Sequence, residues 1–154
     1  MRVVLDTMIL CWGIRGFYPE KGPLSAHAKD FIDYLASEKA TIIVPAPVVS
    51  EFLAGVPLER QPEAIEVLSS QFRIGCFDLR AAACLGDLLA RKLSARSEEL
   101  SKVRVKFDCL VLACALSQKA DIIYSHDDTL IRMAEKKMRA EKMPAVPQQL
   151  PLGV

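Results

Sequence analysis

The sequence has few of the residues that build a zinc site or a disulfide framework. It contains only two histidines, His27 and His126, and none of its five cysteines belongs to a CxxC pair. An odd number of cysteines, most of them in apolar stretches, is typical of buried free thiols that pack as small hydrophobes. We therefore expect reduced cysteines and no zinc.

Long hydrophobic runs are also missing. The longest, Cys109–Leu116, is far shorter than the roughly 20 residues that cross a bilayer. The first residues reach an acid at Asp6 and lack the layout of a signal peptide. Half of the 154 residues are hydrophobic, which suffices for the core of one domain. We expect a soluble, cytoplasmic protein of one domain that does not enter a membrane.

A large net charge is absent as well, since the total is +1, but the charge is unevenly distributed. Residues 91–106 hold six bases against two acids, and residues 132–142 hold five against two, so the rest of the chain is acidic. Such basic segments can bind nucleic-acid phosphates, although mixed-charge helix faces are more often simply solvated. Charge alone favours the solvated interpretation.

Short apolar runs alternate with helical periodicity along the chain. The runs that predict strands are Arg2–Leu5, Thr41–Val44, Arg73–Leu79 and Ile122–Ser125. Between them, periodic apolar residues and capping signals predict six helices: one capped by Ser25, then Pro47–Gly55, 63–70, 81–94, Phe107–Leu116 and Thr129–Met138. Gly13–Pro23 is rich in Gly and Pro and predicts a loop.

This alternation predicts an α/β fold, a single three-layer domain with a mainly parallel sheet of four or five strands flanked by helices. We place the domain at residues 1–143 and a C-terminal edge strand or tail at residues 144–154. Val146 lies between Pro144 and Pro147, so it would form at most a short edge strand. The sequence shows no internal repeat.

Four acids interrupt apolar stretches in a way that solvated acids seldom do. Asp6 directly follows the first strand, and Asp127 lies just beyond the fourth. Glu51 and Asp108 lie within apolar helices. Because ligands of open parallel sheets bind outside the carboxyl ends of the strands, the acids can meet at that edge.

Each acid also has a purely structural explanation. Asp6 or Asp127 could be a helix N-cap after a strand, and Asp108 could favour the positive end of a helix dipole. Asp108, however, has apolar helical neighbours and should point towards the core, where an unpaired carboxylate is costly. Glu51 is neither a cap nor part of a charged face. Asp128 could share or replace the role of Asp127, which we prefer because it follows the strand more directly.

If the four acids converge, their repulsion must be relieved. Like charges about 4 Å apart repel by roughly 4 kcal/mol per pair at an effective dielectric constant of 20. The apolar segments contain no Lys or Arg that would offset this repulsion, so we expect protons or metal ions to do so. Oxygen-only ligands suit Mg²⁺ or Mn²⁺, and Mg²⁺ keeps waters and binds phosphate oxygens. The pattern therefore predicts a phosphoryl-transfer site.

At this point the chain resembles the PIN-domain family, in particular the small toxin ribonucleases called VapC. The motifs that carry the resemblance are Val4–Thr7, Val49–Gly55, Phe107–Ala115 and Tyr124–Asp127, in that order. The Gly13–Pro23 loop is longer than in compact members, and His126 stands where a small or amide residue is common.

The resemblance implies a function and a set of residues. The resemblance implies a Mg²⁺- or Mn²⁺-dependent endoribonuclease that is the toxin of a toxin–antitoxin pair. It also implies an RNA substrate, a cognate antitoxin and a homodimer. Asp6, Glu51, Asp108 and Asp127 carry over as the acidic quartet that binds metal and catalyses. Thr7 and Ser125 carry over as supporting hydroxyls. With such a site, the basic residues Arg91, Lys92, Lys102 and Arg104 become candidate contacts to RNA phosphates.

Three other classes of protein compete with this interpretation. A HAD-like phosphatase would need a second Asp two residues after Asp6, where Met8 stands. A receiver-type phosphoacceptor domain would need clustered acids near the first strand and a Lys after a late strand. A non-catalytic PIN-like scaffold that binds RNA or protein remains the main alternative, although such proteins usually lose one or more of the four acids.

Overall fold

A computed structural model describes residues 1–94 and 102–144 of the chain. Its strands are β1 (Arg2–Leu5), β2 (Thr41–Pro45), β3 (Arg73–Gly75), β4 (Ile122–Tyr124) and β5 (Arg139–Glu141). Its α-helices are α1 (Thr7–Gly13), α2 (Pro23–Ser37), α3 (Ala46–Ala54), α4 (Gln61–Gln71), α5 (Leu79–Ser94), α6 (Lys102–Ser117) and α7 (Asp128–Ala134), and η1 (Leu58–Arg60) is a 3₁₀ turn. No helix within the described ranges is long and apolar enough to span a membrane.

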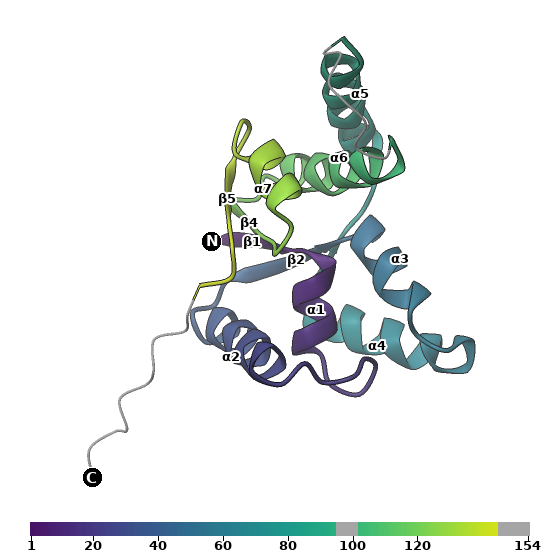
Figure 1. Ribbon diagram of the computed structural model, residues 1–154, viewed down its shortest axis with the longest axis vertical. Coiled ribbons are helices and arrows are strands. Elements are labelled where there is room, and N and C mark those ends of the chain that lie inside the picture. The colour runs from purple at the N-terminus through teal and green to yellow at the C-terminus, as the bar shows by residue number, and fades with distance from the viewer. Residues whose placement is uncertain (95–101, 145–154) are drawn as a thin grey trace, which may run out of the picture.

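The strands form one parallel sheet in the order β3-β2-β1-β4-β5, with Val3 of β1 opposite Ile42 of β2 and Ile122 of β4. Helices α1 to α4 cover one face, and α5, α6 and α7 gather on the other (Figure 1). The predicted α/β class and three-layer architecture are therefore confirmed.

The alternation of side chains along each strand builds two hydrophobic cores. Val3 and Leu5 pack with the layer of α1 to α4, whereas Val4 between them packs with the layer of α5 to α7. The central strands are thus buried on both faces. For this reason their sequences are continuous apolar runs in which polar and apolar residues do not alternate.

The strand order places a crevice at the carboxyl ends of β1 and β4. The chain builds β1, β2 and β3 outward in one direction and then crosses to add β4 and β5 on the other side of β1. The helix that follows β1 therefore enters one layer, and the helix that follows β4 enters the other. At such a switch point the loops diverge and leave room for a ligand.

Near the N-terminus the sequence prediction misses one helix and assigns one helix cap wrongly. Helix α1 was not predicted, because its residues Met8–Trp12 form an unbroken apolar run without a polar face, as expected of a helix packed on several sides. Ser25 is not an N-cap, because α2 already begins at Pro23, after Gly22 with a positive φ of 56°. The Ser25 hydroxyl instead accepts a hydrogen bond from the Lys21 amide at 2.8 Å.

Other predicted boundaries are also wrong. Strand β3 ends at Gly75 rather than Leu79, because the Asp78 side chain accepts from the Ala81 amide at 2.9 Å at the start of α5. Helix α6 begins at Lys102, five residues before the predicted start.

The C-terminal part differs most. Helix α7 ends at Ala134, four residues before the predicted end at Met138, and β5 begins at Arg139, where no strand was predicted. Only Ala140 of β5 is buried, so this edge strand carries little hydrophobic signal. The predicted edge strand at Val146 lies outside the described residues, and the division at residue 143 stays a prediction.

Candidate active site

Asp6 lies at the carboxyl end of β1 and is buried. It caps α1, with its Oδ1 accepting from the Thr7 amide at 2.8 Å. Its Oδ2 accepts from the Ser125 hydroxyl, just after β4, at 2.6 Å. Ser125 in turn accepts from the Asp127 amide at 2.9 Å. The ends of the two central strands are thereby joined through a serine hydroxyl.

Asp127 caps the second helix that starts at this edge. Its Oδ1 accepts from the Thr129 amide at 2.8 Å, which fixes the start of α7. Its Oδ2 accepts from Nη2 of Arg104 on α6 at 2.5 Å. The expectation that no base offsets the acids is therefore wrong, because Arg104 reaches the site from the first turn of α6. Asp128 points elsewhere and pairs with Lys142 at 3.0 Å.

Glu51 lies in the middle of α3 and is exposed. Its Oε2 accepts a hydrogen bond from the Thr7 hydroxyl. Thr7 thus contacts two acids, since its amide binds Asp6 and its hydroxyl binds Glu51. This link ties α3 to the start of α1 at the carboxyl edge of the sheet.

Asp108 lies in the second turn of α6, and one oxygen of its carboxylate has no hydrogen-bond partner among the described residues. Its side chain is 5% exposed, and its Oδ2 is the one buried side-chain oxygen or nitrogen within residues 1–94 and 102–144 that lacks a hydrogen-bond partner. A buried carboxylate oxygen without a donor is costly, because it loses water and gains nothing in return. Such an atom needs an explanation in ligand binding or catalysis.

All four acids line one cavity of about 620 Å³. The wall is completed by α1, α3 and the first turns of α6, and the lining residues beside the acids are Thr7, Met8, Ser50, Val103, Arg104 and Phe107. The acids predicted from separate motifs therefore share one opening. Sequence reasoning missed the apolar part of this wall, although the i, i+4 spacing of Val103 and Phe107 alongside Arg104 and Asp108 was available to indicate it.

The protonation equilibria of the acids reflect their surroundings. Burial, followed by the negative charges of Asp127 and Asp6, raises the pKa of Asp108 to about 6. Burial also raises the pKa of Asp6, although hydrogen bonds from Ser125 and Thr7 oppose the increase. Burial alone would raise the pKa of Asp127, but hydrogen bonds from Arg104 and Thr129 and the charge of Arg104 lower it overall. The two acids that are most buried thus disfavour the charged form.

The donor set fits a divalent cation, but the side chains are not in a closed coordination shell. Within the described ranges, no three His, Cys, Asp or Glu side chains are placed together to hold a metal ion. Asp127 is paired with Arg104 and so is not free to join a coordination shell in this arrangement. The unpaired oxygen of Asp108 and the nearby Asp6 nevertheless provide the hard oxygen ligands that Mg²⁺ and Mn²⁺ prefer.

Arg91, Lys92 and Lys102, the other predicted phosphate contacts, are not among the described residues that line the acid cavity. Arg91 forms an ion pair with Asp87 at 3.1 Å on the exposed face of α5. The side chains of Lys92 and Lys102 lie outside the described residues. Of the four predicted bases, the structure brings Arg104 into the acid cavity.

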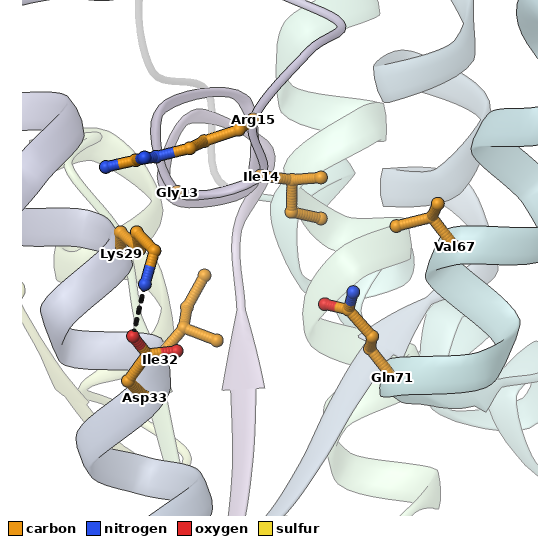
Figure 2. A pocket seen from close by; sticks show the side chains of 8 residues that line it. All are labelled: Gly13, Ile14, Arg15, Lys29, Ile32, Asp33, Val67 and Gln71. Atoms are coloured by element: carbon orange, nitrogen blue, oxygen red, sulfur yellow. Dashed lines mark hydrogen bonds and ion pairs between the residues drawn. The ribbon is translucent and has the colours of Figure 1, made fainter.

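A second cavity, of about 330 Å³, lies between α2, α4 and the C-terminal end of α1. Figure 2 shows Lys29 paired with Asp33 on one side and Val67 and Gln71 on the other. Asp33 is the one acid among the described residues that line it. This cavity therefore lacks the carboxylate cluster that distinguishes the first.

Solved structures share this architecture. A chain of the VapBC2 structure from Rickettsia felis, bound to a DNA fragment from its promoter, matches with a TM-score of 0.68 and 18% identity, covering 94% of this chain and 100% of that one. A chain of VapBC-1 from nontypeable Haemophilus influenzae matches with a TM-score of 0.64 and 16% identity, covering 93% and 98%. A chain of DNA-bound VapBC from Salmonella typhimurium matches with a TM-score of 0.60 and 19% identity, covering 94% and 99%. At these identities the likeness shows the fold.

Sequence comparison supplies the family. No curated protein matches the chain significantly. The model of the PIN domain matches residues 3–136, a range that includes β2 to β4, all of β1 except Arg2, and all four acids. The chain therefore belongs to the PIN domain family.

Proposed function

We propose that the protein is an endoribonuclease that hydrolyses RNA phosphodiester bonds with Mg²⁺ or Mn²⁺ bound at the four acids. The observation that carries this proposal is the buried, unpaired Oδ2 of Asp108 in a cavity shared with Asp6, Glu51 and Asp127. A divalent cation would relieve both the desolvation of Asp108 and the repulsion within the cluster. Membership of the PIN domain family supports the same chemistry.

We assign the four acids different roles in metal binding according to their burial. Asp6 and Asp108, which are buried, would hold the first cation. Glu51 and Asp127 are more exposed and would hold a second cation or orient water. When bound, the cations would supply charge stabilisation at the attacking and leaving oxygens and a water activated for in-line attack on phosphorus. Thr7 and Ser125 keep Asp6 and Glu51 in place through hydrogen bonds.

Arg104 is the residue best placed to bind the substrate backbone. Its guanidinium lies in the acid cavity and is largely exposed, although it is paired with Asp127. A phosphodiester that enters the cavity offers a second anion to the same guanidinium, whose flat fork of donors suits phosphate oxygens. We propose that Arg104 contacts an RNA phosphate, and that Arg91, Lys92 and Lys102 extend this contact along the strand.

The direct test is cleavage of single-stranded RNA by protein purified free of any partner. Wild type should cut with Mn²⁺ or Mg²⁺, and EDTA should stop the reaction. Glu51→Gln should lower the rate by orders of magnitude, roughly 10²-fold or more, because a charge at the reaction centre is lost. The variant should fold normally, since Glu51 is exposed and caps no helix.

Glu59→Gln is the matched control, because it removes the same charge from an exposed position in η1 outside the cavity. Parallel purification of the three proteins controls for contaminating nuclease. A folded Glu51→Gln protein that cuts as fast as wild type would remove Glu51 from the mechanism. If wild type binds RNA but cuts none of a broad panel, the non-catalytic scaffold interpretation replaces the nuclease.

We further propose that the enzyme is the toxin of a toxin–antitoxin pair, acting in the cytoplasm as a homodimer. This proposal rests on the fold shared with VapBC chains from three bacteria. It predicts a small antitoxin-like reading frame beside the gene and growth arrest on expression of the wild type but not of Glu51→Gln. Light scattering of the purified protein tests the dimer. Harmless expression of an active nuclease would contradict the toxin role.

A further inference from the structure

The first turns of α6 present two parallel rows of side chains to the acid cavity. Val103 and Phe107 are four residues apart, and so are Arg104 and Asp108, so each pair stacks along the helix surface. All four residues line the cavity. An apolar row thus runs beside a charged row, with Arg104 and Asp108 adjacent to Val103 and Phe107.

Met8 of α1 adds a third apolar side chain to the lining of the cavity. We call Met8, Val103 and Phe107 the apolar shelf. Val103 is 78% exposed and Met8 is 44% exposed, whereas Phe107 is partly buried and packs against the core. Carboxylates bind a cation without the help of apolar side chains, whereas apolar side chains that line a cavity can bind the apolar surface of a ligand.

We propose that the apolar shelf binds the base of a nucleotide next to the scissile phosphodiester. This inference rests on the proposed nuclease function and names the substrate feature that the site recognises. A nucleic-acid strand carries a phosphate and a base in each repeat. Its phosphate would lie against Arg104 while its base lies on Phe107, Val103 and Met8.

A base can lie on such a surface only when one of its faces is free. Every base has a flat face that stacks on an aromatic or apolar side chain, and this stacking tolerates sequence changes. In a duplex both faces of the base are stacked on neighbours and its edge is paired, so the base would have to leave the helix to reach the shelf.

The test combines protein variants with single-stranded oligoribonucleotides in which one abasic site is moved along the strand. Met8→Gln/Val103→Thr removes apolar surface at exposed positions of two helices, so folding should be preserved. Phe107→Leu keeps an apolar side chain on the core but removes the flat ring. Leu79→Thr is the control, because Leu79 is 85% exposed at the start of α5 and does not line the cavity. The readouts are kcat, KM and binding measured by fluorescence anisotropy.

We expect one abasic position to lower kcat/KM of the wild type by roughly ten-fold, as the stacking of one base implies. The shelf variants should show a similar loss, mainly in KM, on intact RNA, and little further loss on that abasic RNA. The control should behave as wild type. The inference is overturned if no abasic position matters, or if the abasic loss is as large in the shelf variants as in wild type.

Two further outcomes separate this inference from the proposed function. If wild type cuts RNA but the shelf variants match it on every substrate, the nuclease stands and the shelf does not bind a base. If those variants instead lose binding to a co-expressed protein, the shelf is a protein contact, which also overturns the inference. If wild type cuts nothing, the nuclease fails, and the anisotropy series with intact and abasic RNA still decides whether the shelf binds a base.

Discussion

The acids at the strand ends and the acids on the helices reach the same cavity by different structural routes. Asp6 and Asp127 each follow a central strand and cap the next helix, so both carboxylates have backbone partners. Glu51 and Asp108 lie within helices and cap nothing. Asp108 has an oxygen without any partner among the residues that the structure describes.

This difference shows which acids are held by folding and which demand a ligand. A capping carboxylate stabilises its helix whether or not a cation binds, so its presence alone is weak evidence for a metal site. The capping and metal-binding interpretations of Asp6 and Asp127 are therefore compatible. A buried carboxylate that caps nothing costs stability and has to be explained by the function.

We expect the largest effect from Asp108→Asn, which should lower the rate of RNA cleavage. Loss of this charge should lower the cleavage rate with saturating Mn²⁺ by roughly 10²–10³-fold, because a preorganised group at the reaction centre is removed. Single-turnover cleavage of labelled RNA measures the rate. A rate equal to that of the wild type would place Asp108 outside the reaction and leave its burial unexplained.

The same substitution should stabilise the metal-free protein at neutral and alkaline pH. The fold raises the pKa of Asp108 to about 6. The wild type is therefore more stable at pH 4, where Asp108 is protonated in the fold, and it loses this stability as the pH rises through 6. At pH 8 Asp108→Asn should gain about 2–3 kcal/mol over wild type, and at pH 4 nearly nothing. Urea unfolding in EDTA at the two pH values measures this difference. An equal effect at both values would contradict the account.

The strand-end acid should respond in the opposite sense. Asp127→Ala removes the N-cap of α7 and the ion pair with Arg104, and should destabilise the metal-free protein by about 1 kcal/mol. Asp128→Ala is the neighbouring control, since Asp128 is exposed and caps no helix. The contrast between the two classes of acid fails if Asp127→Ala is as stable as this control in urea.

The smallest expected effect concerns RNA affinity. Arg104→Ala should weaken RNA binding and lower the slope of log K against log salt by about 1, because one phosphate contact is lost. Arg91→Ala, whose side chain pairs with Asp87 on an exposed face, should change the slope less. Anisotropy titrations in a series of salt concentrations compare the two. Equal slopes for both variants and wild type would mean that these bases are a solvated face.

The fold could be predicted from the sequence to the extent that each element left a local signal. Buried strands such as β1 and β2 appear as apolar runs, and α3 is bracketed by Pro47 and Gly55. Helix α1 was missed because it is packed against several elements and lacks a polar face. Strand β5 was missed because one buried residue, Ala140, leaves no pattern.

The acids of the candidate site could be predicted from the sequence, but the contacts between its side chains could not. An acid in an apolar context is visible in the sequence, so all four lining acids could be named in advance. The ion pair between Arg104 and Asp127 joins residues 23 positions apart, and the hydrogen bond between Ser125 and Asp6 spans 119. Such contacts depend on how α6 packs against the ends of β1 and β4, which no local pattern encodes.

Calorimetric titration of Mn²⁺ into wild type and Asp108→Asn tests the central claim most directly, because it asks whether the unpaired Asp108 oxygen is a metal ligand without requiring a substrate. Asp87→Asn, which neutralises an exposed aspartate on α5 outside the cavity, is the control. The account predicts Mn²⁺ binding to wild type and to the control, weakened by roughly 10–100-fold or more in Asp108→Asn. Equal Mn²⁺ affinity in all three proteins would show that the four-acid cavity is not where the metal binds.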